Sequence, residues 1–213
     1  TNTNRMKILP FLLIAFILTT SCNQSRKSDS EQDAQGNDEK PVIEYSSRMY
    51  KNTASEKEQS KDYEGAIADY SKALELEPND SSIYYLRGFA KHQKGDYEGA
   101  IADYTKAIET GPNNGMTLFF YARGSAQEKL KNFESALSDY NRALGINPNA
   151  YDIYYNRGQV KDELQDYQGA VYDYTKALEN EPKSANLYYV RATAEYKLED
   201  YKSAVADYSK AIE

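Results

Sequence analysis

The chain has 213 residues, of which 33 are Asp or Glu and 26 are Lys or Arg, giving a formal net charge of -7. This acidic balance excludes a non-specific nucleic-acid binder, which needs a cationic face to displace counterions from phosphates. One Cys and one His exclude an intramolecular disulfide framework, a multi-Cys zinc site and a His-rich metal site. We therefore expect no cofactor and no bound metal.

The first residues predict an export signal. Met6 and Lys7 provide a basic start, the 11 residues from Ile8 to Leu18 are apolar apart from Pro10, and Cys22 follows. Such a run fits the apolar core of a signal peptide and is shorter than the roughly 18–20 residues that span a bilayer as a helix. We predict a signal peptide over residues 1–22 that starts at Met6.

The residues Leu-Thr-Thr-Ser-Cys at the end of this segment resemble the lipobox of bacterial lipoproteins. The resemblance implies that Cys22 carries lipid and begins the mature chain. It would anchor the protein in the bacterial cell envelope, in the periplasm or at the cell surface. An ordinary secretory signal, in which Cys22 has no role, and an uncleaved anchor are the alternatives.

Residues 23–46 are predicted to form a flexible polar tether. From Asn23 to Lys40 the sequence contains no aromatic residue and no aliphatic residue larger than alanine. Such a composition buries too little apolar surface to offset the entropy of ordering.

From residue 47 to the end the sequence repeats itself. The block from Asp62 to Tyr70 recurs unchanged at 96–104, and its aromatic second residue returns at intervals of 34, 36, 34 and 34 residues. A period of this size indicates a stacked repeat array. Gly115 and Met116 are an insertion, and the predicted units are 47–80, 81–114, 117–150, 151–184 and 185–213.

Each unit is predicted to contain two helices. In the second unit Asp96 stands as the N-cap of the second helix, Ala100, Tyr104 and Ala107 share one stripe, and Pro112 ends the helix. The N-caps expected in the other units are Asp62, Asn132, Asp166 and Asp200.

These units resemble tetratricopeptide repeats. In the second unit Tyr84, Gly88, Ala100, Tyr104 and Pro112 match the positions of that family's pattern. The resemblance implies an all-α, right-handed α-solenoid of about five helix-turn-helix repeats. It also implies a non-catalytic scaffold that binds a peptide or protein segment in a concave groove lined by the first helices.

The resemblance assigns nine residues to the peptide-binding groove. They are Lys51, Tyr85, Phe89, Tyr121, Ser125, Tyr155, Gln159, Tyr189 and Thr193. The four tyrosines would offer a flat amphipathic surface at low entropic cost. Alternatively, their rings pack on neighbouring first helices and are structural. Glu128, Asp162 and Glu163 give the far edge an acidic character, which favours a partner containing Lys or Arg.

An aspartate recurs in every unit and an arginine in every unit except the first, where Thr53 stands in its place, and these residues are predicted to form structural ion pairs. The residues are Arg87, Arg123, Arg157, Arg191, Asp69, Asp103, Asp139 and Asp173, with Asp207 in the last unit. A row of arginines that binds an anionic ligand is the alternative. For the ion pairs we predict that each Asp meets the Arg of the following unit, so that Asp69 pairs with Arg87.

No catalytic constellation emerges, so we predict that the protein is not an enzyme. His92 stands alone and is expected at a solvated groove or edge. The sequence stops inside a predicted helix, which would expose Val205, Tyr208 and Ile212 on an uncapped face, and we expect the natural protein to continue. The alternatives are the substrate-positioning arm of an enzyme whose catalytic domain lies beyond residue 213, or a repeat array that self-associates through this face.

Overall fold

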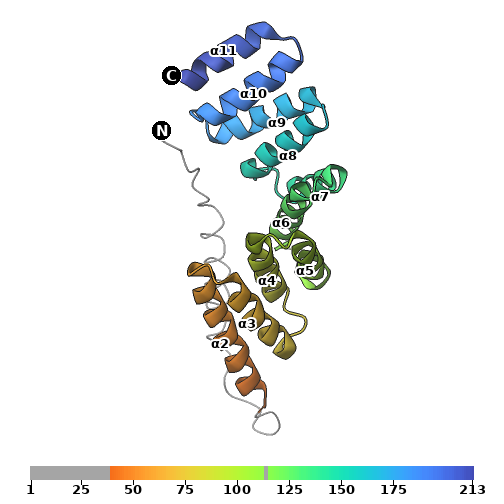
Figure 1. The fold of residues 1–213 in the computed structure, drawn as a ribbon. Coiled ribbons are helices and arrows are strands. Elements are labelled where there is room, and N and C mark those ends of the chain that lie inside the picture. Colours follow the sequence, from red (N-terminus) through yellow and green to blue (C-terminus); the bar gives the residue numbers. More distant parts are fainter. Residues whose placement is uncertain (1–38, 113–114) are drawn as a thin grey trace, which may run out of the picture. The chain divides into compact units, whose positions relative to one another are not determined.

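The structure, a computed structural model, describes residues 39–112 and 115–213. Within these residues it contains ten α-helices and no strand (Figure 1). The helices are α2 (Glu39–Gln59), α3 (Tyr63–Leu76), α4 (Ser81–Lys94), α5 (Tyr97–Thr110), α6 (Met116–Lys129), α7 (Phe133–Ile146), α8 (Tyr151–Glu163), α9 (Tyr167–Asn180), α10 (Ala185–Lys197) and α11 (Tyr201–Ile212).

The helices form five hairpins that pack in chain order within residues 43–213. Hairpin 1 is α2–α3, hairpin 2 is α4–α5, hairpin 3 is α6–α7, hairpin 4 is α8–α9 and hairpin 5 is α10–α11. The second helix of each hairpin packs on the first helix of the next, as α3 does on α4 and α9 on α10. The predicted all-α solenoid of paired helices is confirmed.

The cores of hairpins 1 to 4 are each built around a tyrosine on the second helix, and in hairpin 5 the equivalent Tyr208 is half-buried. Tyr70, Tyr104, Tyr140 and Tyr174 are at most 1% exposed. In hairpin 3 a Cβ atom added to Gly124 would lie only 2.8 Å from the ring of Tyr140. A glycine is needed there because the two helices approach until the ring touches the opposite backbone.

Second helices begin as the sequence predicts in four of the five hairpins. A carboxylate accepts the backbone N–H three residues later at Asp62, Asp96, Asp166 and Asp200. Asn132 precedes α7 without a side-chain capping bond. The residue before each cap lies in the left-handed region, with φ from 60° to 91°. These residues are Lys61, Gly95, Lys131, Gln165 and Glu199.

The predicted end of the tether differs from the structure, because α2 begins at Glu39 and residues 39–46 are helical, whereas the predicted tether extended to residue 46. Met116, the second residue of the predicted insertion between units, is the first residue of α6.

The N-terminal predictions fall on a part of the chain that the structure does not describe. The predicted signal peptide, Cys22 and residues 23–38 of the tether all lie outside the described residues. Among the helices that are described, none combines the length and the apolar character needed to cross a membrane.

Candidate functional site

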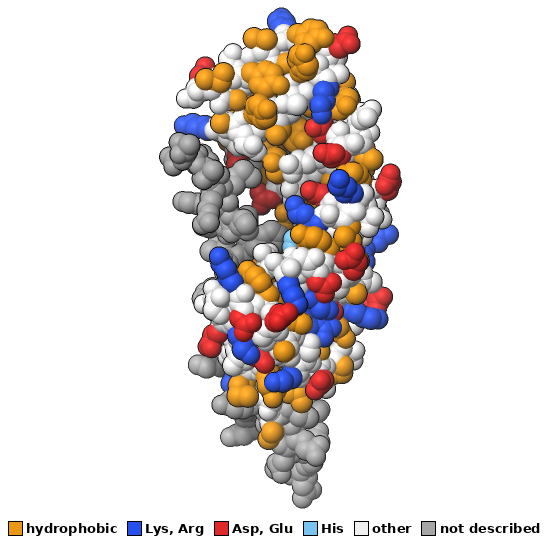
Figure 2. All heavy atoms as spheres, in the orientation of Figure 1, with side chains coloured by type: hydrophobic (Ala, Val, Ile, Leu, Met, Phe, Trp, Pro, Cys, Tyr) orange, Lys and Arg blue, Asp and Glu red, His pale blue; other side chains and the backbone are white. Residues whose placement is uncertain are grey.

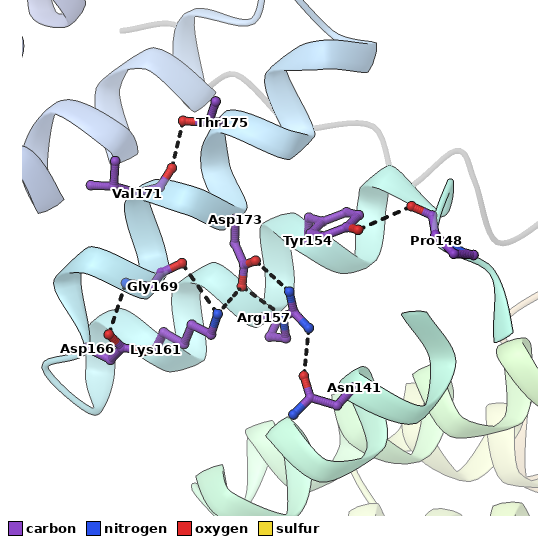
Figure 3. Close-up of polar contacts among 10 residues, drawn as sticks. All are labelled: Asn141, Pro148, Tyr154, Arg157, Lys161, Asp166, Gly169, Val171, Asp173 and Thr175. Carbon is purple, nitrogen blue, oxygen red and sulfur yellow. Dashed lines mark hydrogen bonds and ion pairs between the residues drawn. The ribbon is translucent and has the colours of Figure 1, made fainter. Parts of the chain in front are cut away.

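From α4 onward, each first helix carries an arginine that pairs with an aspartate of its own hairpin. In hairpin 4, Nε and Nη2 of Arg157 donate to Oδ2 and Oδ1 of Asp173 at 2.8 and 2.6 Å (Figure 3). The side chain of Asp173 is completely buried. The same two-pronged contact joins Arg87 to Asp103, Arg123 to Asp139 and Arg191 to Asp207.

The predicted register of these pairs, in which Asp69 meets Arg87, is wrong. Asp69 instead accepts hydrogen bonds from Thr53 and Lys57 on α2 of its own hairpin. The pairing is therefore internal to every hairpin. Hairpin 1 uses Lys57 and Thr53 in place of the arginine.

The third guanidinium nitrogen of each arginine, Nη1, donates a hydrogen bond to the preceding hairpin. Nη1 of Arg157 donates to Oδ1 of Asn141 on α7 at 2.6 Å (Figure 3). The corresponding acceptors of the other arginines are Ser71, Thr105 and Thr175. Each arginine thus joins three helices, and this arrangement favours the structural interpretation over a row that binds an anionic ligand.

A lysine one turn after the arginine reinforces the aspartate in hairpins 2 and 4. Nζ of Lys161 lies 2.9 Å from Asp173, and Nζ of Lys91 lies 2.8 Å from Asp103. In hairpin 5 the corresponding residue is Glu195, which is 8% exposed. Its Oε1 lies 3.9 Å from Nε of Arg191, and its Oε2 is buried without a hydrogen-bond partner.

Glu195 is the residue of hairpin 5 that sequence reasoning missed. Burial raises the pKa of its carboxyl to about 7, the charge of Asp207 adds to this effect, and Arg191 opposes it. The more distant charges of Asp200 and Lys210 act in opposite directions on the same group. The sequence does mark this residue, because it is acidic at a position where hairpins 1, 2 and 4 have lysine.

We expect Glu195→Gln to stabilise the protein at alkaline pH. The pKa is higher in the folded chain than in the unfolded chain, so the glutamate favours folding below about pH 4.5 and loses this contribution as the pH rises through about 7. The glutamine variant should therefore match the wild type near pH 5 and exceed it at pH 8 by about 1 kcal/mol in free energy of unfolding. Urea denaturation at both pH values measures the difference. A gain of the same size at both pH values would contradict an ionisation effect.

The predicted groove tyrosines differ from one another in exposure. These four residues, here called the tyrosine row, are Tyr85, Tyr121, Tyr155 and Tyr189. Tyr85 is 3% exposed, Tyr121 and Tyr155 are half-buried, and Tyr189 is 56% exposed. Each ring packs on the equivalent second-helix tyrosine of its hairpin, with centroids 5.7–6.2 Å apart; these partners are Tyr104, Tyr140, Tyr174 and Tyr208. Tyr85 is therefore structural, and accessible ring surface begins at Tyr121.

Asparagine side chains fix the hydroxyl groups in the middle of the tyrosine row. Nδ2 of Asn156 donates to the hydroxyl of Tyr121 at 2.7 Å, and Nδ2 of Asn186 donates to that of Tyr155 at 3.3 Å. Gln159 also donates to Tyr155, at 3.1 Å. Each asparagine belongs to the first helix that follows its tyrosine. Sequence analysis did not identify either asparagine, because nothing in the repeat pattern pairs these two positions.

The other predicted groove residues lie along the same first helices. Phe89, Ser125, Gln159 and Thr193 are half-buried. Lys51 is engaged within the fold, because its Nζ lies 3.5 Å from Glu77 and 3.3 Å from Asp80.

The acidic edge is partly tied to the core. Glu128 accepts a hydrogen bond from the hydroxyl of Tyr140 at 2.7 Å, and burial raises the pKa of its carboxyl. Asp162 pairs with Lys197 at 2.8 Å. Glu128 and Glu163 line a shallow pocket of about 310 Å³ together with Phe133 and Lys129.

His92 is not the solvated residue that the sequence predicts. It is half-buried, its ring packs edge-on against Tyr97 at 5.1 Å, and its Nε2 is buried without a hydrogen-bond partner. Burial, aided by the charge of Lys129, lowers its pKa to about 4. Within the described ranges no group of three or more His, Cys, Asp or Glu residues is arranged to hold a metal ion.

Comparisons with known proteins identify the repeats. A model of the TPR repeat matches residues 59–95, and models of the tetratricopeptide repeat match 81–114, 118–150 and 155–213. No curated protein matches the sequence significantly.

Several solved structures share the fold. MamA is 24% identical with a TM-score of 0.74, and the match covers 79% of this chain and 91% of MamA. YrrB, described as a TPR protein with an unusual peptide-binding site, is 26% identical with a TM-score of 0.69, covering 81% of this chain and 89% of YrrB. A tetratricopeptide repeat protein from Parabacteroides merdae is 24% identical with a TM-score of 0.71, covering 79% of this chain and 66% of that protein. The stacked hairpins, their glycine-tyrosine contacts and these matches together show that the chain belongs to the tetratricopeptide repeat family.

Proposed function

We propose that the protein is a non-catalytic scaffold that binds a peptide or protein segment along the tyrosine row. A lipid on Cys22 holds it to a bacterial envelope membrane. The observation that carries the proposal is the accessible ring surface on successive first helices, provided by the half-buried Tyr121 and Tyr155 and by the exposed Tyr189. Membership of a family whose members bind protein partners supports the same function.

The middle of the row is arranged for binding at low entropic cost. The rings of Tyr121 and Tyr155 rest on core tyrosines, and asparagine side chains hold their hydroxyls. A side chain that is already fixed loses little rotamer freedom when a partner docks on it. Tyrosine also offers apolar ring area together with a polar tip, which suits an extended segment.

Acidic residues beside the row are the basis for expecting a partner that contains Lys or Arg. Glu128 and Glu163 line the pocket beside Phe133, but Lys129 and Lys131 line it as well. The charges of this pocket are therefore balanced, and the expected preference for a basic partner rests on the sequence alone.

The membrane anchor is inferred from the sequence. The apolar run from Ile8 to Leu18 ends shortly before Cys22, and Cys22 is the only cysteine in the chain. One acyl chain gives marginal, reversible membrane binding, whereas two or more give a stable anchor. The lipid arrangement of bacterial lipoproteins, which Cys22 resembles, would meet this requirement.

The environment of His92 is consistent with a scaffold that has no catalytic histidine. A pKa of about 4 keeps its ring neutral at physiological pH, and its Nε2 lies against protein rather than solvent. A general base must reach the proton that it removes. This nitrogen is not placed to do so.

Site-specific crosslinking in cells tests both parts of the proposal. A photoreactive phenylalanine analogue at position 155 or 189 should capture the same partner. The analogue at 172 should not, although Tyr172 is 55% exposed, because it lies on a second helix. Tyr121→Ala should reduce capture from position 189 about fivefold, in line with the loss of an interface aromatic. The adduct should sediment with membranes in the Cys22 chain and remain soluble in the Cys22→Ser chain.

The two parts can fail separately. Equal capture from positions 155 and 172 would show that the tyrosine row is not the binding surface. An adduct that still sediments with membranes after Cys22→Ser would contradict the lipid anchor while leaving the binding surface in place.

A further inference from the structure

The hydroxyl of Tyr155, in the middle of the tyrosine row, is saturated as a hydrogen-bond acceptor. Nε2 of Gln159, one turn further along α8, donates to it at 3.1 Å, and Nδ2 of Asn186 on α10 donates to it at 3.3 Å. A phenolic oxygen has two acceptor sites and one proton. Because amide N–H groups occupy both acceptor sites, Tyr155 can form a hydrogen bond with a partner only by donating its own proton.

The proton of Tyr155 is available to a partner. Within residues 39–112 and 115–213 no group accepts a hydrogen bond from this hydroxyl, whose two hydrogen bonds are both accepted ones. These two bonds also restrict the direction in which the remaining O–H can point. A donor that is oriented before binding loses little entropy when it meets its acceptor.

The ring of Tyr155 is held in place by three helices. It projects from α8, its centroid lies 6.2 Å from that of Tyr174 on α9, and it packs against the apolar clusters that contain Leu187 and Ala194 of α10. The neighbouring ring of Tyr121 lies 6.0 Å from its own core tyrosine. Two half-buried rings on adjacent first helices are therefore fixed before a partner arrives.

The charges near these rings do not select a charged partner. Figure 2 shows Lys and Arg side chains interspersed with Asp and Glu on the face that it presents. The pocket that Gln159 helps to line contains two glutamates and two lysines. A carboxylate of a partner would in addition approach a chain of net charge -7, which disfavours it as the acceptor. We therefore expect Tyr155 to meet a neutral acceptor, such as a main-chain carbonyl.

A polyproline II segment supplies such carbonyls. In helices and sheets the carbonyls of a partner already accept hydrogen bonds from its own amides, whereas a polyproline II helix has no internal hydrogen bonds. Proline also lacks a backbone N–H, so the segment brings no donor that needs an acceptor. Proline-rich segments dock on aromatic-lined surfaces, and their preformed backbone reduces the entropic cost. These properties match two fixed rings and a hydroxyl that can only donate.

We propose that the partner segment bound along the tyrosine row is proline-rich and adopts the polyproline II conformation, and that Tyr155 donates a hydrogen bond to one of its main-chain carbonyls. Gln159 and Asn186 are positioning residues, because they occupy the acceptor sites of the hydroxyl and so direct its proton toward the partner. The inference rests on the proposed function and names the class of partner.

Fluorescence anisotropy with defined peptides tests the proposal. The probe is a fluorescein-labelled, amidated decaproline peptide added to the full chain, and the comparison peptide is an alternating Gly-Ser peptide of the same length with the same ends. Saturable binding is expected for decaproline only. Tyr155→Phe keeps the ring and removes only the hydroxyl, so it should weaken decaproline binding about fivefold, as expected for one lost hydrogen bond. Tyr172→Phe removes a hydroxyl from an exposed tyrosine of a second helix and should leave the affinity unchanged.

A double-mutant cycle tests the two positioning residues. Gln159→Leu and Asn186→Ala should each weaken decaproline binding about threefold in the wild-type background. Neither should change the affinity in the Tyr155→Phe background, because no hydroxyl proton remains to be directed. An equal loss in both backgrounds would show that the two amides contribute only to packing and would contradict the positioning role.

Three further results would overturn the proposal. Equal decaproline affinity for the wild type and Tyr155→Phe would remove the hydroxyl as the donor. Equal affinity for decaproline and the Gly-Ser peptide would show that the row has no preference for a proline-rich segment. Absence of decaproline binding, combined with crosslinking in cells from position 155 and not from 172, would reject the proline-rich partner while leaving the proposed function in place.

Discussion

Replacing Asp173 with Ala is expected to lower the free energy of unfolding by about 3–5 kcal/mol, the usual cost of removing one partner from a buried ion pair. The carboxylate of Asp173 is completely buried and faces both Arg157 and Lys161 (Figure 3). Its removal leaves two cations without their counter-charge inside hairpin 4. Urea denaturation followed by circular dichroism measures the loss.

Two comparisons separate this effect from a general effect of losing an aspartate. Asp166→Ala removes the exposed N-cap of α9, the helix that also carries Asp173, and should cost only about 1 kcal/mol. The double variant Arg157→Leu/Asp173→Leu should recover part of the loss, because it removes one pair of opposite charges together and leaves only Lys161 unpaired. If Asp173→Ala lowers the free energy of unfolding no more than Asp166→Ala does, then leaving Arg157 and Lys161 without their counter-charge does not destabilise the protein.

The repeat period alone predicts most of the fold. A Gly on the first helix and a Tyr on the second recur in step, as Gly124 and Tyr140 do in hairpin 3, and the structure places each such pair in contact. This inference succeeds because a thin hairpin has one way to bury its apolar stripe, which is against its neighbours. The start of α2 at Glu39 was not predictable in the same way, since residues 39–46 lack the repeat pattern.

The register of the ion pairs was predicted wrongly, although the sequence carries a signal for it. The offset from each Arg to the Asp of its own unit is 16 residues in all four units that have an Arg. The offset from each Asp to the Arg of the next unit is 18, 20, 18 and 18 residues, because the insertion interrupts it. The first unit misled the prediction, because Asp69 has no arginine in its hairpin and yet is satisfied by Lys57 and Thr53.

The exposure of the tyrosine row depends on neighbours rather than on repeat position. Tyr85 and Tyr189 occupy the same place in their hairpins, but Tyr85 packs on Phe119 of the next hairpin as well as on its own core. Tyr121 and Tyr155 are intermediate, and each receives a hydrogen bond from the following hairpin. A periodic pattern assigns all four residues the same environment. The increase in exposure from Tyr85 to Tyr189 therefore cannot be predicted from the sequence alone.

Replacing Tyr140 with Ala should cost about 3–5 kcal/mol, as expected for deleting a buried aromatic ring. Tyr140 is completely buried, its ring fills the space above Gly124, and its hydroxyl donates to Glu128. The cavity cannot close easily, because the two helices are already in contact through this glycine. Because hairpin 3 is the middle of five, we also expect the urea transition to separate into two, with hairpins 1–2 and 4–5 unfolding independently.

Matched tyrosine variants show whether position or residue type is responsible. Tyr172→Ala, on the second helix of the next hairpin, removes a ring that is 55% exposed and should change stability by no more than about 0.5 kcal/mol. Tyr140→Phe keeps the ring, loses only the bond to Glu128 and should cost about 1 kcal/mol. Hydrogen exchange can assign the two transitions of Tyr140→Ala to the two halves of the chain. A single transition, with all five hairpins losing protection together, would mean that coupling between hairpins does not pass through this ring, and that the backbone contacts of α6 and α7 suffice to transmit it.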